Sequence, residues 1–364
     1  MTSQRRTVDV SIPIGPVHPC WKEPARIKCV TRGEFVESAE VELGYMKKGI
    51  ERIMRGRPWQ EVMILAERVC GICSVIHNMV FIEAMEKISG ISVPDRAAYL
   101  RIAVNELDRI QSHLLANFSY CYTIEHETLA MYLLNTRERA MDELERITGA
   151  RVNKAYMVPG GVRFDLPEED RGKVLASLDT LQEETARYMG MFEGGPLIAT
   201  RSRGVGILTA EDARRAHAVG PTARASGIAV DLRLEHPTYR KLRFAPVIRT
   251  EGDNFARVMA RFQEIQVSID LIRQCLTDLP AGPIRGGGAC GAGEITHRGE
   301  APRGELSYFI RADEYGRILD ISIQTPSIMN IDACAHHMIP GAGSLADMTA
   351  TFISADPCIA CTER

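Results

Sequence analysis

The sequence predicts an α+β protein that is mostly helical. Apolar residues recur at helical spacing over several long stretches, which indicates a central bundle of long helices. Alternating apolar and polar residues near both ends predict a small N-terminal β element and a C-terminal β-hairpin. With 364 residues the chain can bury a large core, and we expect a single domain over residues 1–364.

The chain divides into four stretches of different pattern. Residues 1–43 hold the β element, because apolar and polar residues alternate there between Gly and Pro breaks from residue 7 onward. Residues 44–280 hold the helical bundle. Residues 281–297 include six glycines and no packing signal, so we expect a surface loop. Residues 298–364 hold the hairpin and then two short helices that lead to the C-terminus.

Within the bundle, apolar periodicity and end signals place the helices. Pro94 suits the first turn of a helix, whereas Gly149 and Pro280 suit positions just past helix ends. A turn around Cys70 and Cys73 falls inside the second helical pattern. The predicted helices cover residues 45–55, 59–89, 94–115, 128–147, 168–191 and 254–279. The predicted hairpin strands cover residues 305–311 and 317–324.

Composition excludes two classes of protein. The 44 basic and 47 acidic residues leave a net charge of −3, whereas nucleic-acid binding needs clustered positive charge. No stretch approaches the roughly 20 apolar residues of a membrane span, so we expect the chain to lie outside the bilayer. We see no signal-peptide pattern, and we expect the scattered cysteines to be reduced, small and buried. They are Cys20, Cys29, Cys121, Cys275, Cys290 and Cys334.

Two C-x-x-C pairs lie near opposite ends of the chain, at Cys70 and Cys73 and at Cys358 and Cys361. Two intervening residues let both sulfurs of a pair face one metal, and four thiolates complete the shell of a soft transition metal. The pairs are much farther apart than the roughly 12–20 residues typical of local zinc sites. A structural zinc and an iron–sulfur cluster remain alternatives. No strand–GxGxxG–helix unit is present, so we expect no nicotinamide or flavin on this chain.

Several motifs together resemble the large, catalytic subunit of nickel–iron hydrogenases. They are Glu67-Arg-Val-Cys-Gly-Ile-Cys-Ser74, Glu300-Ala-Pro-Arg-Gly304, Thr325-Pro-Ser327 and Asp356-Pro-Cys-Ile-Ala-Cys361. Other motifs resemble the membrane-bound, energy-converting (Ech-type, group 4) branch, which is related to the 49-kDa subunit of respiratory complex I. These are Gly15-Pro-Val-His-Pro-Cys-Trp-Lys-Glu-Pro24, Gly44-Tyr-Met-Lys-Lys-Gly-Ile-Glu-Arg52 and Asn105-Glu-Leu-Asp-Arg-Ile-Gln-Ser-His-Leu114. The resemblance covers essentially the whole chain.

The resemblance implies a nickel–iron centre in which the iron carries two cyanides and one carbon monoxide, Fe(CN)2(CO). By that resemblance, Cys70 and Cys358 are terminal nickel ligands, whereas Cys73 and Cys361 bridge nickel and iron. Thiolates suit this task because they are soft donors. The cysteines are also the most specific part of the resemblance, since the complex I relatives lack these four ligands.

The resemblance also implies a proton route, because the family splits H₂ heterolytically and the proton must leave a buried site. Cys358 is then the first base and Glu23 the next carrier, and His18 lies in the same segment. A surface carboxylate before the turn-forming Pro24 is the alternative reading of Glu23.

Several residues are expected to support the centre without binding nickel. Arg303 is expected to hydrogen-bond a cyanide, because a guanidinium offers a fixed fork of donors. Pro326 and Ser327 match the segment that packs against the other diatomic ligand. Asp356 either fixes the Arg303 side or simply starts an Asp-Pro turn. His77, about one helical turn beyond Cys73, either hydrogen-bonds a thiolate or is a satisfied core histidine.

The C-terminus carries a further expectation. Glu51 matches a position that in many relatives binds a second metal, magnesium or iron, near the C-terminus. Those relatives end in histidine where this chain has Arg364, and an arginine is not a metal ligand. A salt bridge between Glu51 and Arg364 is therefore the expected replacement for that metal.

Partners follow from the electron chemistry and from the resemblance. Electrons must leave singly, and no further cysteine set here could hold a chain of clusters, so we expect a small subunit that carries an iron–sulfur cluster. The resemblance implies ferredoxin as electron carrier and membrane ion-pumping subunits at the cytoplasmic face of the membrane, where this chain would bind peripherally. The alternative is a coupling subunit like the 49-kDa relative, which acts at a quinone site without hydrogenase activity.

Overall fold

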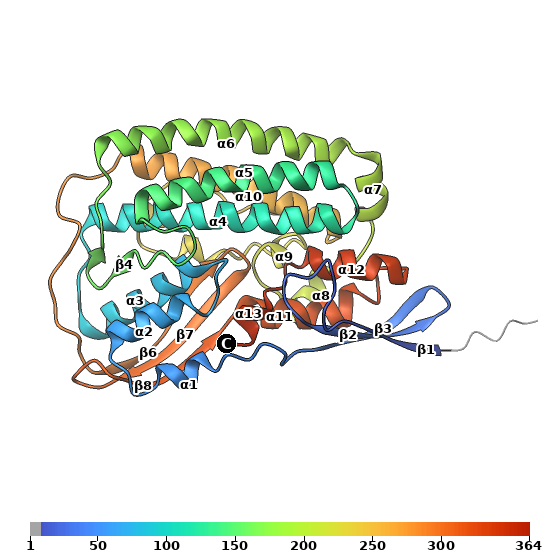
Figure 1. The fold of residues 1–364 in the computed structure, drawn as a ribbon, viewed down its shortest axis with the longest axis horizontal. Helices are drawn as coiled ribbons and strands as arrows, with labels where there is room; N and C mark the ends of the chain where they lie inside the picture. The colour runs from blue at the N-terminus through green and yellow to red at the C-terminus, as the bar shows by residue number, and fades with distance from the viewer. Residues whose placement is uncertain (1–8) are drawn as a thin grey trace, which may run out of the picture.

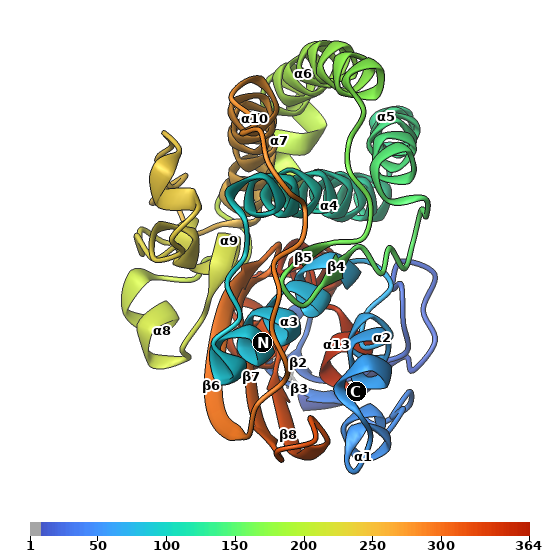
Figure 2. The same ribbon diagram turned by 90° about the vertical axis from the view of Figure 1, so that its left-hand side faces the viewer.

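The four longest helices of the described chain run alongside one another as a bundle, with α4 and α6 on opposite sides of the α5 and α10 pair (Figures 1 and 2). The computed structural model describes residues 9–364, so the first eight residues of the predicted β element lie outside the described residues. Helix α4 packs against α5 and α10, and α6 packs against the same two helices on the outer side (Figure 2). The predicted central bundle is confirmed. Its helices are α4 (Asp95–Thr123), α5 (Glu127–Thr148), α6 (Glu168–Gly194) and α10 (Asn254–Thr277).

Local signals explain where these helices begin and end. Pro94 is the N-cap of α4, and Gly149 ends α5 with a φ of 78°, which a residue with a side chain rarely adopts. Asp253 caps α10, because its carboxylate accepts a hydrogen bond from the Ala256 backbone N–H at 2.8 Å. No helix within residues 9–364 is long and apolar enough to cross a membrane.

Helix α4 is buried on nearly every side, although its sequence is only partly apolar. Its apolar residues face the bundle, as periodicity predicts. Its polar face is also buried and lies over the second layer of the molecule, so those polar groups need partners within the protein. That face includes Asn105, Glu106, Asp108, Arg109, Gln111, Ser112 and His113.

The second layer contains a C-terminal sheet covered by a helix. Strands β6 (Gly293–Ala301), β7 (Gly304–Ala312) and β8 (Ile318–Gln324) form an antiparallel sheet in that order. Helix α3 (Ser74–Ser89) packs on β6 and β7, and α1 (Ile50–Met54) contacts β8. Helix α2 (Trp59–Glu67) packs against α3.

The prediction of a two-stranded hairpin after a loop over 281–297 was wrong in one respect. Residues 293–297 are already part of strand β6, so the sheet has three strands. Strand β6 lies at the edge of the sheet, where many of its residues are exposed and polar, and it therefore lacks the apolar alternation that marks β7.

The turn predicted around Cys70 and Cys73 is confirmed, because it separates α2 from α3. Two smaller expectations need correction. The short helix predicted over 45–55 begins only at Ile50. Cys20 and Cys290 are half-buried, whereas the other four scattered cysteines are buried as expected.

The N-terminal strands extend to one side of the molecule and contact its C-terminal part. β1 (Asp9–Ile14), β2 (Arg26–Arg32) and β3 (Phe35–Glu42) form an antiparallel sheet (Figure 1). The Leu345 N–H donates to the Glu34 carbonyl at 2.9 Å, which ties the sheet to α12 (Leu345–Ser354). The remaining elements are short: β4 (Met157–Val158), β5 (Gly161–Val162), α7 (Pro196–Ser202), α8 (Ala210–Arg215), α9 (Gly220–Arg224), η1 (Leu232–Leu234), η2 (Tyr239–Lys241), α11 (Pro326–Ala333), the π-helix η3 (Cys334–Met338) and α13 (Ile359–Thr362).

Candidate metal centre

Both C-x-x-C pairs lie in turns that lead into helices. The first turn joins α2 to α3, and Cys73 is the N-cap of α3. The second follows α12, and Cys358 is the N-cap of α13. Asp356 in this second turn has a φ of 53°, which bends the chain before Pro357.

The four sulfurs meet in one buried cluster. Sγ of Cys70 lies 3.4 Å from Sγ of Cys358, and Sγ of Cys73 lies 3.7 Å from Sγ of Cys361. All four are free thiols with at most 2% exposure. The sequence could not show that the two distant pairs face each other. In the structure, the ligating atoms of Cys70, Cys358 and Cys361 lie within 4.8 Å of one another, as do those of Cys73, His77 and Cys361, so the two groups share Cys361.

Crowding of the sulfurs separates their acidities. Hydrogen bonds from the thiols of Cys361 and Cys70 favour the Cys73 thiolate and lower the pKa of Cys73 to about 6. Hydrogen bonds with Cys358, Cys70 and Cys73, together with burial, raise the pKa of Cys361 well above its ordinary value. Thiols that interact this closely release their protons in separate steps. A bound metal cation would displace those protons, because it needs the thiolate form of each cysteine.

His77 connects the cluster to the sheet. Its Nε2 lies 3.6 Å from Sγ of Cys361, and its Nδ1 shares a hydrogen bond of 2.8 Å with the Tyr308 hydroxyl. Burial lowers the pKa of His77 to about 3, so the ring is neutral at ordinary pH. Both readings of His77 therefore describe it: it is a satisfied core histidine that also touches a sulfur.

Arg303 and Asp356 form a buried ion pair beside the sulfurs. Nε of Arg303 donates to the Asp356 carbonyl at 2.9 Å, and a terminal nitrogen donates to the Asp356 carboxylate at 3.0 Å. Lys22 donates to the same carboxylate oxygen at 3.0 Å. Burial alone would raise the pKa of Asp356, but Arg303 and Lys22 hold it well below its usual range. Asp356 thus fixes both the Arg303 side chain and the turn that carries the terminal cysteines.

The turn that carries Arg303 is held by groups that the sequence patterns did not reveal. Arg109 of α4 donates to the carbonyls of Glu300 and Ala301, at 2.6 and 3.1 Å. Asn330 of α11 donates to the Arg303 carbonyl at 3.1 Å. Gly220 lies so close on the other side that a Cβ there would meet the Arg303 carbonyl oxygen at 2.3 Å. Only the motif resemblance around Arg109 gave a signal for these contacts.

The segment that begins α11 supports the terminal motif. Pro326 is the first residue of α11, and the next residue, Ser327, accepts a hydrogen bond from the Cys358 N–H at 3.0 Å. The Thr325 hydroxyl lies 3.3 Å from the Cys361 carbonyl and donates to it. These contacts fix the backbone of both terminal cysteines.

Glu23 lies at the cluster, whereas His18 does not. A carboxylate oxygen of Glu23 accepts a hydrogen bond of 2.6 Å from the Ala360 N–H, between the two terminal cysteines. Burial and the neighbouring Cys358 sulfur raise the pKa of Glu23. His18 packs on Trp21 with 5.0 Å between ring centroids, and its Nδ1 accepts from the Cys20 N–H.

The C-terminal residues are anchored away from the sulfurs. Nε of Arg364 donates to Glu51 at 3.0 Å, and the same carboxylate oxygen accepts from the Ile323 N–H at 2.7 Å. The predicted salt bridge is therefore present. Glu363 accepts backbone hydrogen bonds from Gly44 and Met46, so both terminal side chains hold the chain end in place.

The chain is similar to two families of known proteins. Residues 124–289 and 286–364 match the family described as respiratory-chain NADH dehydrogenase, 49 Kd subunit, and residues 48–122 match the nickel-dependent hydrogenase family. The chain is 37% identical to the carbon monoxide-induced hydrogenase of Rhodospirillum rubrum, over 97% of this chain and 99% of that protein. It is 35% identical to the membrane-bound hydrogenase subunit alpha of Pyrococcus furiosus, over 98% and 87%.

A solved structure shares the whole architecture. It is a chain of the membrane-bound sulfane sulfur reductase, an archaeal respiratory membrane complex, with a TM-score of 0.92 at 26% identity over 98% of both chains. The chain belongs to the family that unites large subunits of membrane-bound, energy-converting nickel–iron hydrogenases with the 49-kDa subunit of respiratory-chain NADH dehydrogenase.

Proposed function

We propose that this chain is the catalytic subunit of a ferredoxin-linked nickel–iron hydrogenase that cleaves and forms H₂ reversibly. The observation that carries this proposal is the buried convergence of four thiols from opposite ends of the chain. A nickel–iron centre with Fe(CN)2(CO), held by these cysteines, would supply the heterolytic chemistry of H₂. The similarity to two hydrogenases over nearly the whole chain supports this choice of metal over zinc.

The surroundings of the sulfurs also fit such a centre better than a structural zinc. A closed zinc site needs only its thiolates. Here Arg303 uses three N–H groups, two in bonds to Asp356 and one to the Ser112 hydroxyl at 3.2 Å, and its guanidinium has two further N–H groups left. We propose that Arg303 donates to a cyanide, and that Pro326 and Ser327 pack against the other diatomic ligand.

In the proposed reaction, Cys358 takes the proton first and Glu23 carries it onward. Glu23 is half-buried, so its carboxyl can exchange a proton between the site and the surface. Its raised pKa brings the group closer to neutral pH, where a carrier works best. His18 lies in the same segment and packs on Trp21, and it is the proposed exit for the proton if Glu23 is not the carrier. His77 is proposed to stabilise the Cys361 thiolate.

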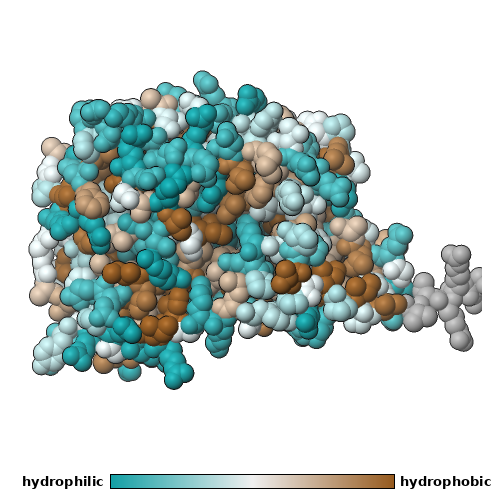
Figure 3. All heavy atoms as spheres, viewed as in Figure 1, coloured by the Kyte–Doolittle hydropathy of each residue, from teal (hydrophilic) through white to brown (hydrophobic). Residues whose placement is uncertain are grey.

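Partners are proposed from the same reasoning. A small subunit with an iron–sulfur cluster would pass electrons to ferredoxin, and membrane ion-pumping subunits would hold the chain at the cytoplasmic face. Figure 3 shows apolar residues gathered over α2 and along the N-terminal sheet, where a partner could bind. Exposed apolar side chains of these elements include Ile64, Val10 and Phe35. We also propose that the Glu51–Arg364 salt bridge replaces the second metal, magnesium or iron.

A second candidate function is a coupling subunit without hydrogenase activity. It is favoured by the match of residues 124–289 and 286–364 to the 49-kDa subunit family. Such a subunit would act at a quinone site and would need no nickel. The metal content of the cysteine site separates the two functions.

Replacing a single proposed ligand tests the catalytic function. Cys70→Ser and Cys361→Ser are each expected to lose nickel and to abolish H₂ oxidation, because a neutral hydroxyl is a poor nickel donor. The half-buried Cys290→Ser serves as the control and should retain both. Metal analysis and H₂ oxidation are measured on purified protein. Full nickel together with activity in either ligand variant would contradict the proposal.

Arg303→Lys keeps the charge but loses the planar fork. Because Asp356 and Lys22 remain, we expect the metal content to survive while turnover falls at least ~10-fold, equivalent to about 1.4 kcal/mol of barrier. Arg298→Lys, an exposed change on the preceding strand, is the matched control. Unchanged turnover in metal-replete Arg303→Lys protein would reduce Arg303 to a structural role.

Glu23→Gln separates proton transfer from metal binding. Glutamine can still accept the Ala360 hydrogen bond but cannot carry a proton. We expect H₂ oxidation, H₂ evolution and H₂/D₂O exchange to fall together while nickel content stays unchanged. Glu40→Gln, an exposed change on strand β3 of the N-terminal sheet, should have no effect. Normal exchange in a nickel-replete Glu23→Gln enzyme would rule out the relay.

A further inference from the structure

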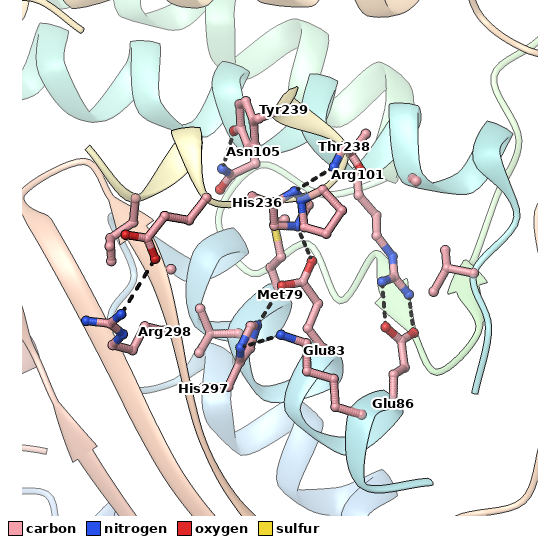
Figure 4. Close-up of a pocket in the computed structure, with 18 of the residues that line it drawn as sticks. Met79, Glu83, Glu86, Arg101, Asn105, His236, Thr238, Tyr239, His297 and Arg298 are labelled. Carbon is pink, nitrogen blue, oxygen red and sulfur yellow. Dashed lines mark hydrogen bonds and ion pairs between the residues drawn. The ribbon is translucent and has the colours of Figure 1, made fainter. Parts of the chain in front are cut away.

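A cavity of about 650 Å³ lies along helix α3, between this helix, the start of α4, the η1–η2 segment and β6. Figure 4 shows its polar side chains pointing toward one another from these elements. Its volume falls within the range of small-molecule sites, roughly 300–1,000 Å³. None of the proposed metal ligands or proton carriers lines it.

The centre of the cavity is a carboxylate between two histidines. Glu83 of α3 accepts hydrogen bonds of 2.9 Å from Nε2 of both His236 and His297. Each imidazole accepts a hydrogen bond at Nδ1, from the Thr238 N–H in one ring and from Lys87 in the other. In each ring, Nε2 therefore carries the proton that Glu83 accepts. Burial opposes ionisation, but the two histidines hold the pKa of Glu83 well below its usual range.

This arrangement does not suit a metal ion. The Nε2 protons point at the carboxylate, so a cation would have to displace both of them. Within residues 9–364, Glu83, His236 and His297 do not form a group whose ligating atoms lie within 4.8 Å of one another. The geometry therefore argues against a metal site at this position.

The charges around the cavity are balanced. Arg101 pairs with Glu86 at 2.6 Å, and Lys241 pairs with Asp95 at 2.8 Å. Glu300 pairs with Arg224 at 2.7 Å, beyond the cavity wall. A charged ligand would thus leave an uncompensated charge in a partly dry site, which is costly. Five basic and five acidic side chains line it: Lys87, Arg101, Arg233, Lys241 and Arg298, with Glu83, Glu86, Asp95, Glu235 and Glu300.

The same wall offers both hydrogen bonds and apolar contact. Lys87 has further N–H groups beyond the one bound to His297, and the Asn105 side chain donates to Tyr239 while its own carbonyl remains an acceptor. Part of the apolar wall comes from α3 and η1. These two elements contribute Ile76, Met79, Val80 and Leu232, and Ile91, Val93, Ala98 and Pro237 complete the apolar lining.

We propose that this cavity binds a neutral small molecule with an apolar, ring-sized body and a hydroxyl or carbonyl head. The body lies against the α3 and η1 wall, and the head hydrogen-bonds among Glu83, Lys87 and Asn105. The proposal is independent of the metal centre, because none of these residues belongs to it.

Three probes with one apolar body and different head charges test the proposal: 1-naphthol, 1-naphthoate and 1-naphthylmethylammonium. Binding to the purified full-length chain, and to its complex where one is isolated, is measured at pH 7 by saturation-transfer NMR. We expect 1-naphthol to bind at least ~10-fold more tightly than either charged probe, a difference of about 1.4 kcal/mol.

A cavity-filling variant locates the binding. Ala98 is half-buried and lines the cavity, so Ala98→Leu should weaken 1-naphthol binding at least ~10-fold. Ala186→Leu makes the same change on the exposed face of α6 and should leave binding unchanged. The proposal is overturned if wild-type protein does not bind 1-naphthol, if a charged probe binds as tightly, or if Ala98→Leu binds it as well as Ala186→Leu does.

Discussion

The rest of the structure depends on one constraint: the two distant C-x-x-C turns must bring their four sulfurs together. A turn after α2 and a turn after α12 must place their thiols within 3.7 Å of each other. The last residues therefore cannot fray as termini usually do. Glu363 and Arg364 bind Gly44, Met46 and Glu51 in the N-terminal part of the chain, and Thr325 and Ser327 hold the backbone of the terminal motif.

The second layer of the site depends on charges buried in the bundle. Arg109 of α4 holds the turn that carries Arg303, and Glu106 balances Arg109 at 3.2 Å. Breaking such a buried pair typically costs about 3–5 kcal/mol, because the remaining charge is left uncompensated. The bundle is therefore more than a scaffold: its polar face positions a guanidinium beside the cysteines. Asp356 does the same from the opposite side, through its ion pair with Arg303.

Much of this could be predicted from the sequence. Periodicity together with Pro94, Gly149 and Pro280 predicted the long helices, and the paired motifs predicted the cysteines. Strand β6 was missed because an edge strand need not alternate. The polar contacts of Arg109 were missed because periodicity identifies the apolar face of a helix and is silent about a polar face that is also buried. Glu23 contacts the terminal cysteine turn whereas His18 packs on Trp21, and this difference depends on tertiary packing, which no local sequence pattern records.

The central claim is that the four cysteines bind nickel together with iron. Metal analysis combined with nickel K-edge X-ray absorption of the purified protein in its native complex tests this most directly. We expect nickel that is surrounded mainly by sulfur and has an iron neighbour, and we expect no nickel in Cys361→Ser protein. Zinc in the cysteine site, or a cysteine site that holds no nickel in protein purified from nickel-supplied cells, would contradict it.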